Sequence, residues 1–207
     1  MKKISLIIFS SFIFFACINT NLNSKNDLAN TQKKTNDTIF VKDYSAFNKN
    51  DIGKEIIVDN YSKINIQKIS KSELKDLCST KKVTCLIFWA PWCTGCCKAL
   101  KSIYKDIINE NKSNATFALI SISDNLNANQ KELYNSQYYL QSYVLDAEFY
   151  KGTSDDDFPK LRLFLDEIFP NKQIKHYVPL MIMLNQKQEL LANDPMFKDE
   201  IKKIINK

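Results

Sequence analysis

Residues 83–96 read VTCLIFWAPWCTGC, and this stretch decides the fold. Its first part, residues 83–89, is a nearly continuous apolar run, which is typical of a strand buried on both faces of a sheet. A helical pattern follows from Thr94 to about Asn111, so residues 90–93 are expected to turn from the strand into a helix. The stretch therefore predicts an α/β domain with this strand inside a central sheet.

The segments on either side continue the alternation of strands and helices. We expect strands at residues 55–58, 64–69, 117–122, 178–184 and 189–192, and helices at residues 70–79, 127–143, 154–168 and 195–205. The last two strands are expected to form an antiparallel hairpin, which makes the sheet mixed. Because helices that follow strands in this order cover both faces of a sheet, the pattern predicts a central mixed β-sheet flanked by helices.

The chemical signal is the pair of cysteines in Cys93-Thr94-Gly95-Cys96. At a strand-to-helix turn, Cys93 would lie at the helix N-terminus, where unpaired backbone N–H groups favour negative charge. This position favours the thiolate, which is the form that attacks disulfides. Cys96 begins an apolar stripe along the helix, so it is expected to face the core. The spacing predicts Cys93 as an exposed nucleophile and Cys96 as a buried resolving cysteine, together a redox-active disulfide.

The N-terminus has the pattern of a secretory signal. Two lysines precede an apolar stretch at residues 4–16, which is too short to span a bilayer as a helix and ends at Cys17. The pair Ala16-Cys17 is similar to the end of a bacterial lipoprotein signal, in which the cysteine is lipidated and becomes the mature N-terminus. The alternative is a plain signal peptide in which Cys17 is one more apolar residue.

A polar segment follows this signal. Residues 18–50 are rich in Asn, Lys, Thr and Asp, so we expect a flexible tether. The chain then divides into a signal peptide at residues 1–17, this tether, and a folded domain at residues 51–207. A lipidated Cys17 would hold the exported protein at a membrane of the cell envelope or periplasm, where disulfides can persist.

The composition excludes several other classes of protein. Of the 207 residues, 44% are hydrophobic and 25% charged, which is ordinary for a globular domain. The net charge of +6 comes from lysines spread along the chain, and Arg162 is the only arginine, so no nucleic-acid partner is expected. Only three glycines occur, which excludes glycine-rich phosphate loops. No organic cofactor is expected, because the cysteine pair itself carries the electrons.

Residues 89–96, WAPWCTGC, resemble the signature of the thioredoxin superfamily, and most closely its exported, membrane-tethered branch of ResA/TlpA-like disulfide reductases. The resemblance covers about residues 50–207 by element order. It implies a thioredoxin-like three-layer fold, protein thiol–disulfide oxidoreductase activity, and a cis-proline loop facing the two cysteines. The loop is matched by position at Val178-Pro179. The substrate contacts implied in this way are Trp92, Thr94, Gly95, Val178 and Pro179.

The resemblance also implies partners. The substrate class is exported protein disulfides or thiols, including those of apocytochrome c, and the electrons come from a donor in the membrane. We expect a monomer. The direction of electron flow stays open, because Thr94-Gly95 differs from the common Gly-Pro and this dipeptide helps to set the redox potential.

Two positions depart from the family pattern. Ile87 and Ala99 stand where members of the family carry an acid that accepts the proton of the resolving cysteine. Water, Lys98 or His176 are the substitutes that the sequence offers. His176 is the only histidine, and a solvated loop residue is its plainer interpretation.

The remaining cysteines leave alternatives open. Cys97 lies four residues after Cys93, on the same side of the helix, and is either a bystander thiol or part of the exchange. Cys93, Cys97 and His176 together resemble the copper site of Sco-like delivery proteins, which is the alternative function. A third alternative is a redox-silent module that binds peptides beside Pro179. Cys78 and Cys85 either form a structural disulfide or are small buried residues.

Overall fold

The computed structural model describes residues 43–150, 158–195 and 197–207. The expected signal peptide, Cys17 and most of the expected tether lie outside these residues, as do residues 154–157 of one expected helix. Among the described residues, no helix combines the length and the apolar character that crossing a membrane requires.

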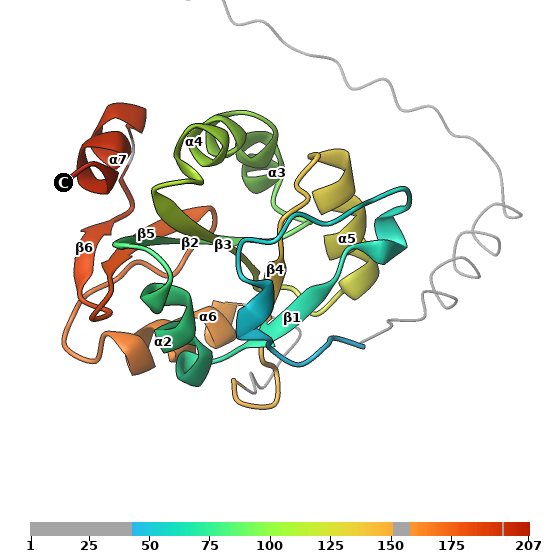
Figure 1. The fold of residues 1–207 in the computed structure, drawn as a ribbon. Coiled ribbons are helices and arrows are strands. Elements are labelled where there is room, and N and C mark those ends of the chain that lie inside the picture. Colours follow the sequence, from blue (N-terminus) through green and yellow to red (C-terminus); the bar gives the residue numbers. More distant parts are fainter. Residues whose placement is uncertain (1–42, 151–157, 196) are drawn as a thin grey trace, which may run out of the picture. The chain divides into compact units, whose positions relative to one another are not determined.

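The described residues form one six-stranded mixed sheet at the centre of the domain (Figure 1). The strands are β1 (Ile66–Ile69), β2 (Val83–Trp89), β3 (Ala115–Ser121), β4 (Ser142–Leu145), β5 (Leu180–Asn185) and β6 (Leu190–Asn193). Their order is β1-β4-β3-β2-β5-β6, with the first four parallel and the last two antiparallel to their neighbours. Every residue of β2 is buried, which confirms the central strand that the apolar run predicts.

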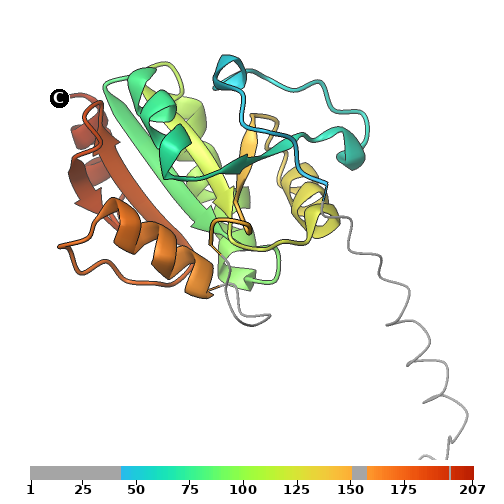
Figure 2. The ribbon, with the colours of Figure 1, turned by 90° about the horizontal axis from the view of Figure 1, so that it is seen from below.

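Helices cover both faces of this sheet, as Figures 1 and 2 show. They are α2 (Lys71–Ser79), α3 (Thr94–Lys101), α4 (Ile103–Asn111), α5 (Leu126–Asn135), α6 (Phe158–Ile168) and α7 (Lys198–Ile205). Leu100, Leu133 and Ile201, from three of these helices, belong to one core cluster, whereas Leu77 and Phe164 belong to the other. The domain therefore has the three layers of a thioredoxin-like fold, with α3, α4, α5 and α7 on one face and α2 and α6 on the other.

The helix expected over residues 94–111 is in fact two helices. Ser102 separates α3 from α4 with a φ of −129° and a ψ of −98°, and its hydroxyl donates to the Lys98 carbonyl over 2.8 Å. Leu100 and Ile107, on either side of the break, belong to the same buried core cluster. Because the apolar pattern continues across the break, periodicity alone could not reveal it.

Two further predictions from periodicity were wrong. The helix expected over residues 127–143 ends at Asn135, and the fully buried strand β4 begins seven residues later. In between, Gln137 adopts a φ of +54° and turns the chain. The strand expected at residues 55–58 is reduced to an isolated bridge between Glu55 and Leu140, and Ile57 is 94% exposed. Short strands are the elements that periodicity identifies least well.

Residues 43–50, which the sequence assigns to the tether, contact the domain. Ser45 forms a parallel bridge with Gln67 of β1, and the ring of Phe47 lies 5.8 Å from that of Tyr143. The segment therefore packs onto the outermost strand of the sheet. Such cover protects an edge strand from pairing with another chain.

Candidate functional site

The centre of the site is a disulfide between Cys93 and Cys96, whose Cα atoms are 5.2 Å apart. β2 ends at Trp89, a short turn follows, and Cys93 is the N-cap residue of α3. The Cys96 N–H donates to the Cys93 sulfur over 3.1 Å. Cys93 is half-buried, whereas Cys96 is fully buried. The two sulfurs thus share one bond but differ in their access to solvent.

The loop before β5 faces this disulfide. The Val178–Pro179 peptide bond is cis. The Val178 carbonyl oxygen lies 3.6 Å from the sulfur of Cys93. A methyl group on Gly95 would lie 3.8 Å from Cδ of Pro179, so the proline ring sits directly against the first turn of α3. The cis-proline loop facing the cysteine pair is therefore present at the position that the resemblance indicates.

Two residues of the motif are accessible from outside. Trp92 is 52% exposed, and its ring meets that of Phe158 at the start of α6, edge to face, at 5.8 Å. Thr94 is exposed beside it. Cys93 and Gly95 of the motif thus lie beside Val178 and Pro179 of the loop, where β2 gives way to α3.

The comparisons with known proteins give one family match. Residues 65–137 match the family model of thioredoxin. This match covers about a third of the chain and agrees with the thioredoxin-like fold of the described residues. No curated protein is significantly similar to the chain.

Solved structures are similar at low identity. The C-terminal domain of a protein described as a thiol-disulfide oxidoreductase from Bacteroides thetaiotaomicron is 18% identical with a TM-score of 0.48, and the match covers 77% of this chain and 99% of that one. The thioredoxin domain of a thiol-disulfide oxidoreductase from Bacteroides vulgatus is 17% identical, with a TM-score of 0.46 and coverages of 64% and 82%. A secreted disulfide oxidoreductase of Mycobacterium tuberculosis is 17% identical, with a TM-score of 0.41 and coverages of 60% and 81%.

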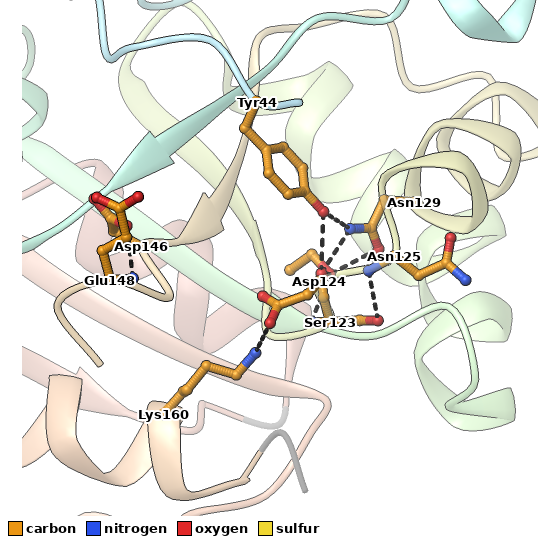
Figure 3. Close-up of polar contacts among 9 residues, drawn as sticks. Tyr44, Ser123, Asp124, Asn125, Asn129, Asp146, Glu148 and Lys160 are labelled. Carbon is orange, nitrogen blue, oxygen red and sulfur yellow. Dashed lines mark hydrogen bonds and ion pairs between the residues drawn. The ribbon is translucent and has the colours of Figure 1, made fainter. Parts of the chain in front are cut away.

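The domain carries a polar network in the loop after β3 (Figure 3). Asn129 of α5 is fully buried, accepts a hydrogen bond from the Ser121 hydroxyl over 2.8 Å and donates to the Ser123 carbonyl over 2.8 Å. The Tyr44 hydroxyl joins the same network. Since the Ile122 N–H donates to the Trp89 carbonyl, this network fixes a loop directly beside the cysteine motif.

An ion pair ties α6 to that loop. The Lys160 ammonium lies 2.8 Å from a carboxylate oxygen of Asp124, and the Lys160 side chain is only 7% exposed. Figure 3 shows Lys160 extending from α6 toward Asp124. The ion pair holds the first turn of α6 in place. Phe158 belongs to this turn, so the pair also keeps the Phe158 ring against that of Trp92. Sequence reasoning missed Lys160, because nothing in the pattern of one chain segment distinguishes a buried lysine from an exposed one.

The structure does not assemble the alternative copper site. Among the residues that the structure describes, no group of three or more His, Cys, Asp or Glu side chains is close enough to hold a metal ion. Cys93, Cys97 and His176 all belong to the described residues. His176 instead lies 3.6 Å from Asp166 of α6.

The two positions at which the family carries an acid are apolar in the structure. Ile87 is fully buried in the core and Ala99 is half-buried, so the structure shows apolar side chains where an acid was sought. Lys98 is exposed on α3.

Cys78 and Cys85 are both buried free thiols, so the structural disulfide between them is not formed.

Cys97 has a polar environment of its own. Its thiol donates to the Pro91 carbonyl over 3.4 Å. Burial, together with the nearby carboxylate of Glu132, raises the pKa of Cys97 to about 11, and Lys101 acts in the opposite direction. Lys101 and Glu132 form an ion pair at 3.0 Å. Near neutral pH, Cys97 is therefore a thiol rather than a thiolate.

This environment predicts slow alkylation of Cys97. With the Cys93–Cys96 disulfide intact, iodoacetamide should modify Cys97 at pH 8 on the order of 100-fold more slowly than a free cysteine peptide, since only the thiolate reacts. The rate should rise about tenfold per pH unit between pH 8 and 10. Glu132→Gln removes a nearby negative charge and should accelerate the reaction. Mass spectrometry of the modified peptide measures each rate, and a rate that is flat with pH would contradict the prediction.

Proposed function

We propose that the protein is an exported, membrane-tethered thiol–disulfide oxidoreductase that exchanges disulfides with extracytoplasmic proteins through Cys93 and Cys96. The observation that carries this proposal is the cysteine pair itself: one half-buried and one buried sulfur at the start of a helix, opposite Val178 and Pro179.

The exchange is a two-step displacement. In the reduced enzyme, the Cys93 thiolate attacks one sulfur of a substrate disulfide, a mixed disulfide forms, and the first substrate sulfur leaves as a thiolate that takes up a proton. The Cys96 thiolate then attacks the Cys93 sulfur and releases the second substrate sulfur in the same way. Two electrons have passed from the enzyme to the substrate, and the Cys93–Cys96 disulfide remains. A dithiol donor restores the reduced pair by the reverse steps.

The N-cap position supports Cys93 as the attacking residue. The Cys96 N–H that donates to the Cys93 sulfur over 3.1 Å would also donate to a thiolate at that position. Backbone N–H groups and the positive end of the helix dipole stabilise such an anion. Cys96 is shielded from solvent, so an external disulfide reaches Cys93 first.

The substrate would bind in extended form along the cis-proline loop. Val178 offers a backbone carbonyl next to the reacting sulfur, and Trp92 offers an exposed aromatic surface. The other contacts with the substrate would come from Thr94, Gly95 and Pro179. Extended, unfolded cysteine-containing segments, such as those of apocytochrome c, suit this arrangement, and the cysteine pair needs no organic cofactor.

The proposal includes export and a lipid anchor at Cys17. A donor in the membrane would supply the electrons, and the protein would pass them on as a ResA/TlpA-like disulfide reductase. The support is the sequence of residues 1–17 and the polar segment that separates Cys17 from the domain. We propose that the domain acts as a monomer.

The test is the reduction of insulin disulfides by dithiothreitol, followed as turbidity. Wild-type protein should accelerate the reaction, and Cys97→Ser should retain most of the rate, because Cys97 is not part of the exchanging pair. A Cys93→Ser/Cys96→Ser double variant should match the rate of dithiothreitol alone. A wild type that matches dithiothreitol alone would instead support a redox-silent peptide-binding module.

A further inference from the structure

Tyr177, the residue before the cis-proline loop, is tied to a distant part of the chain. Its hydroxyl donates a hydrogen bond to the carboxylate of Asp194, which follows β6. The bond joins two loops that flank the β5–β6 hairpin. Tyr177 is half-buried, and the Lys175 ammonium lies 5.7 Å from the centre of its ring.

Asp194 is itself held in place by the backbone. It adopts a φ of +55°, in the left-handed region that Asp and Asn tolerate better than most residues. Its N–H donates to the Met181 carbonyl of β5 over 2.7 Å. This bond fixes the backbone of Asp194 to β5 at Met181, which lies only two residues after Pro179.

A third side chain, that of Tyr104, lies near this hydrogen bond. Tyr104 of α4 is half-buried and packs against the same core cluster as Val178. Burial raises the pKa of Tyr104 to about 12, and the neighbouring Asp194 and Tyr177 act in the same direction. Tyr104 of α4 therefore lies near the end of β6 and near the residue that precedes Val178.

We propose that the Tyr177–Asp194 hydrogen bond positions the cis-proline loop, so that the Val178 carbonyl is held toward Cys93 for pairing with an extended substrate. This inference rests on the proposed function. Neither side chain touches the sulfurs in the described contacts, so both are positioning residues rather than catalytic ones. Without the bond, the segment before Val178 would lose its tie to β6, and the loop would meet the substrate in a wider range of orientations.

The test is the split between KM and kcat for insulin reduction. Tyr177→Phe removes the donor, and Asp194→Gly removes the acceptor while it suits the positive φ. Each should raise KM by about fivefold, the effect of one lost hydrogen bond, with kcat nearly unchanged. Asp194→Asn keeps an acceptor oxygen and should restore a KM close to that of the wild type. The Tyr177→Phe/Asp194→Gly double variant should show no further increase, because both changes remove the same bond.

Two further readouts separate this role from a general loss of structure. The midpoint potential of the Cys93–Cys96 pair should be the same in all these variants, and Tyr61→Phe, at an exposed tyrosine of another segment, should leave KM unchanged. An active wild type with an unchanged KM in Tyr177→Phe would overturn the positioning role alone. An inactive wild type would overturn the proposed function, and the inference with it.

Discussion

A Cys96→Ser variant should accumulate a mixed disulfide with its substrate, whereas a Cys93→Ser variant should form none. The half-buried Cys93 can still attack when Cys96 is replaced, but no neighbouring thiolate then displaces the product. Turnover should fall on the order of 100-fold or more in both variants, because each lacks one of the two sulfurs that complete the exchange. The asymmetry follows from the different burial of the two sulfurs.

The measurement is mass spectrometry after a short incubation of each reduced variant with insulin and an acid quench. The adduct in Cys96→Ser should map to Cys93. A matched Cys96→Ser/Cys97→Ser variant should trap the same adduct, which shows that Cys97 is not the attacking residue. Adducts on Cys97, or equal trapping by the two single variants, would contradict the assignment of roles.

Replacing Lys160 should lower the free energy of unfolding of the domain. The Lys160→Met variant keeps most of the side-chain volume but takes the ammonium away from Asp124, with which it pairs at 2.8 Å. Because the Asp124 carboxylate that loses this partner is 24% exposed, the free energy of unfolding should fall by about 2 kcal/mol, less than for a fully buried pair. Urea unfolding followed by circular dichroism measures this loss, and the Cys93–Cys96 pair should be kept oxidised throughout.

Two controls make the Lys160 result specific. Lys131→Met, at an exposed position of α5, should change the free energy of unfolding by less than about 0.5 kcal/mol. An Asp124→Asn/Lys160→Met double variant should recover part of the loss, because replacing both members of a buried pair is often nearly neutral. A Lys160→Met variant as stable as the wild type would show that the ion pair does not hold α6 to the loop after β3.

The centre of the domain could be predicted from the sequence. A strand buried on both faces is typically a nearly continuous apolar run, and residues 83–89 form such a run, interrupted only by Thr84. The placement of Cys93 at the helix start follows from that strand, since the motif comes directly after it. The cis-proline loop came from the resemblance to a family rather than from local pattern.

The remaining features depend on contacts between distant segments. Strand β4 has only four residues, and its burial arises from pairing with β1 and β3. Lys160 is buried because Asp124, 36 residues earlier, lies across from it. The Tyr177–Asp194 bond likewise joins residues 17 positions apart around a hairpin. Helix and strand periodicity reports only near neighbours, so it holds no information on such pairs.

Cys93 and Cys96 should form a reversible two-electron couple, which a redox titration measures. The protein is equilibrated in dithiothreitol buffers of graded potential, free thiols are alkylated, and mass spectrometry identifies each cysteine. We expect one transition with a slope of about 30 mV per decade, confined to Cys93 and Cys96, while Cys78, Cys85 and Cys97 remain thiols throughout. The absence of a reversible transition, or a couple that includes Cys97 in place of Cys96, would contradict it.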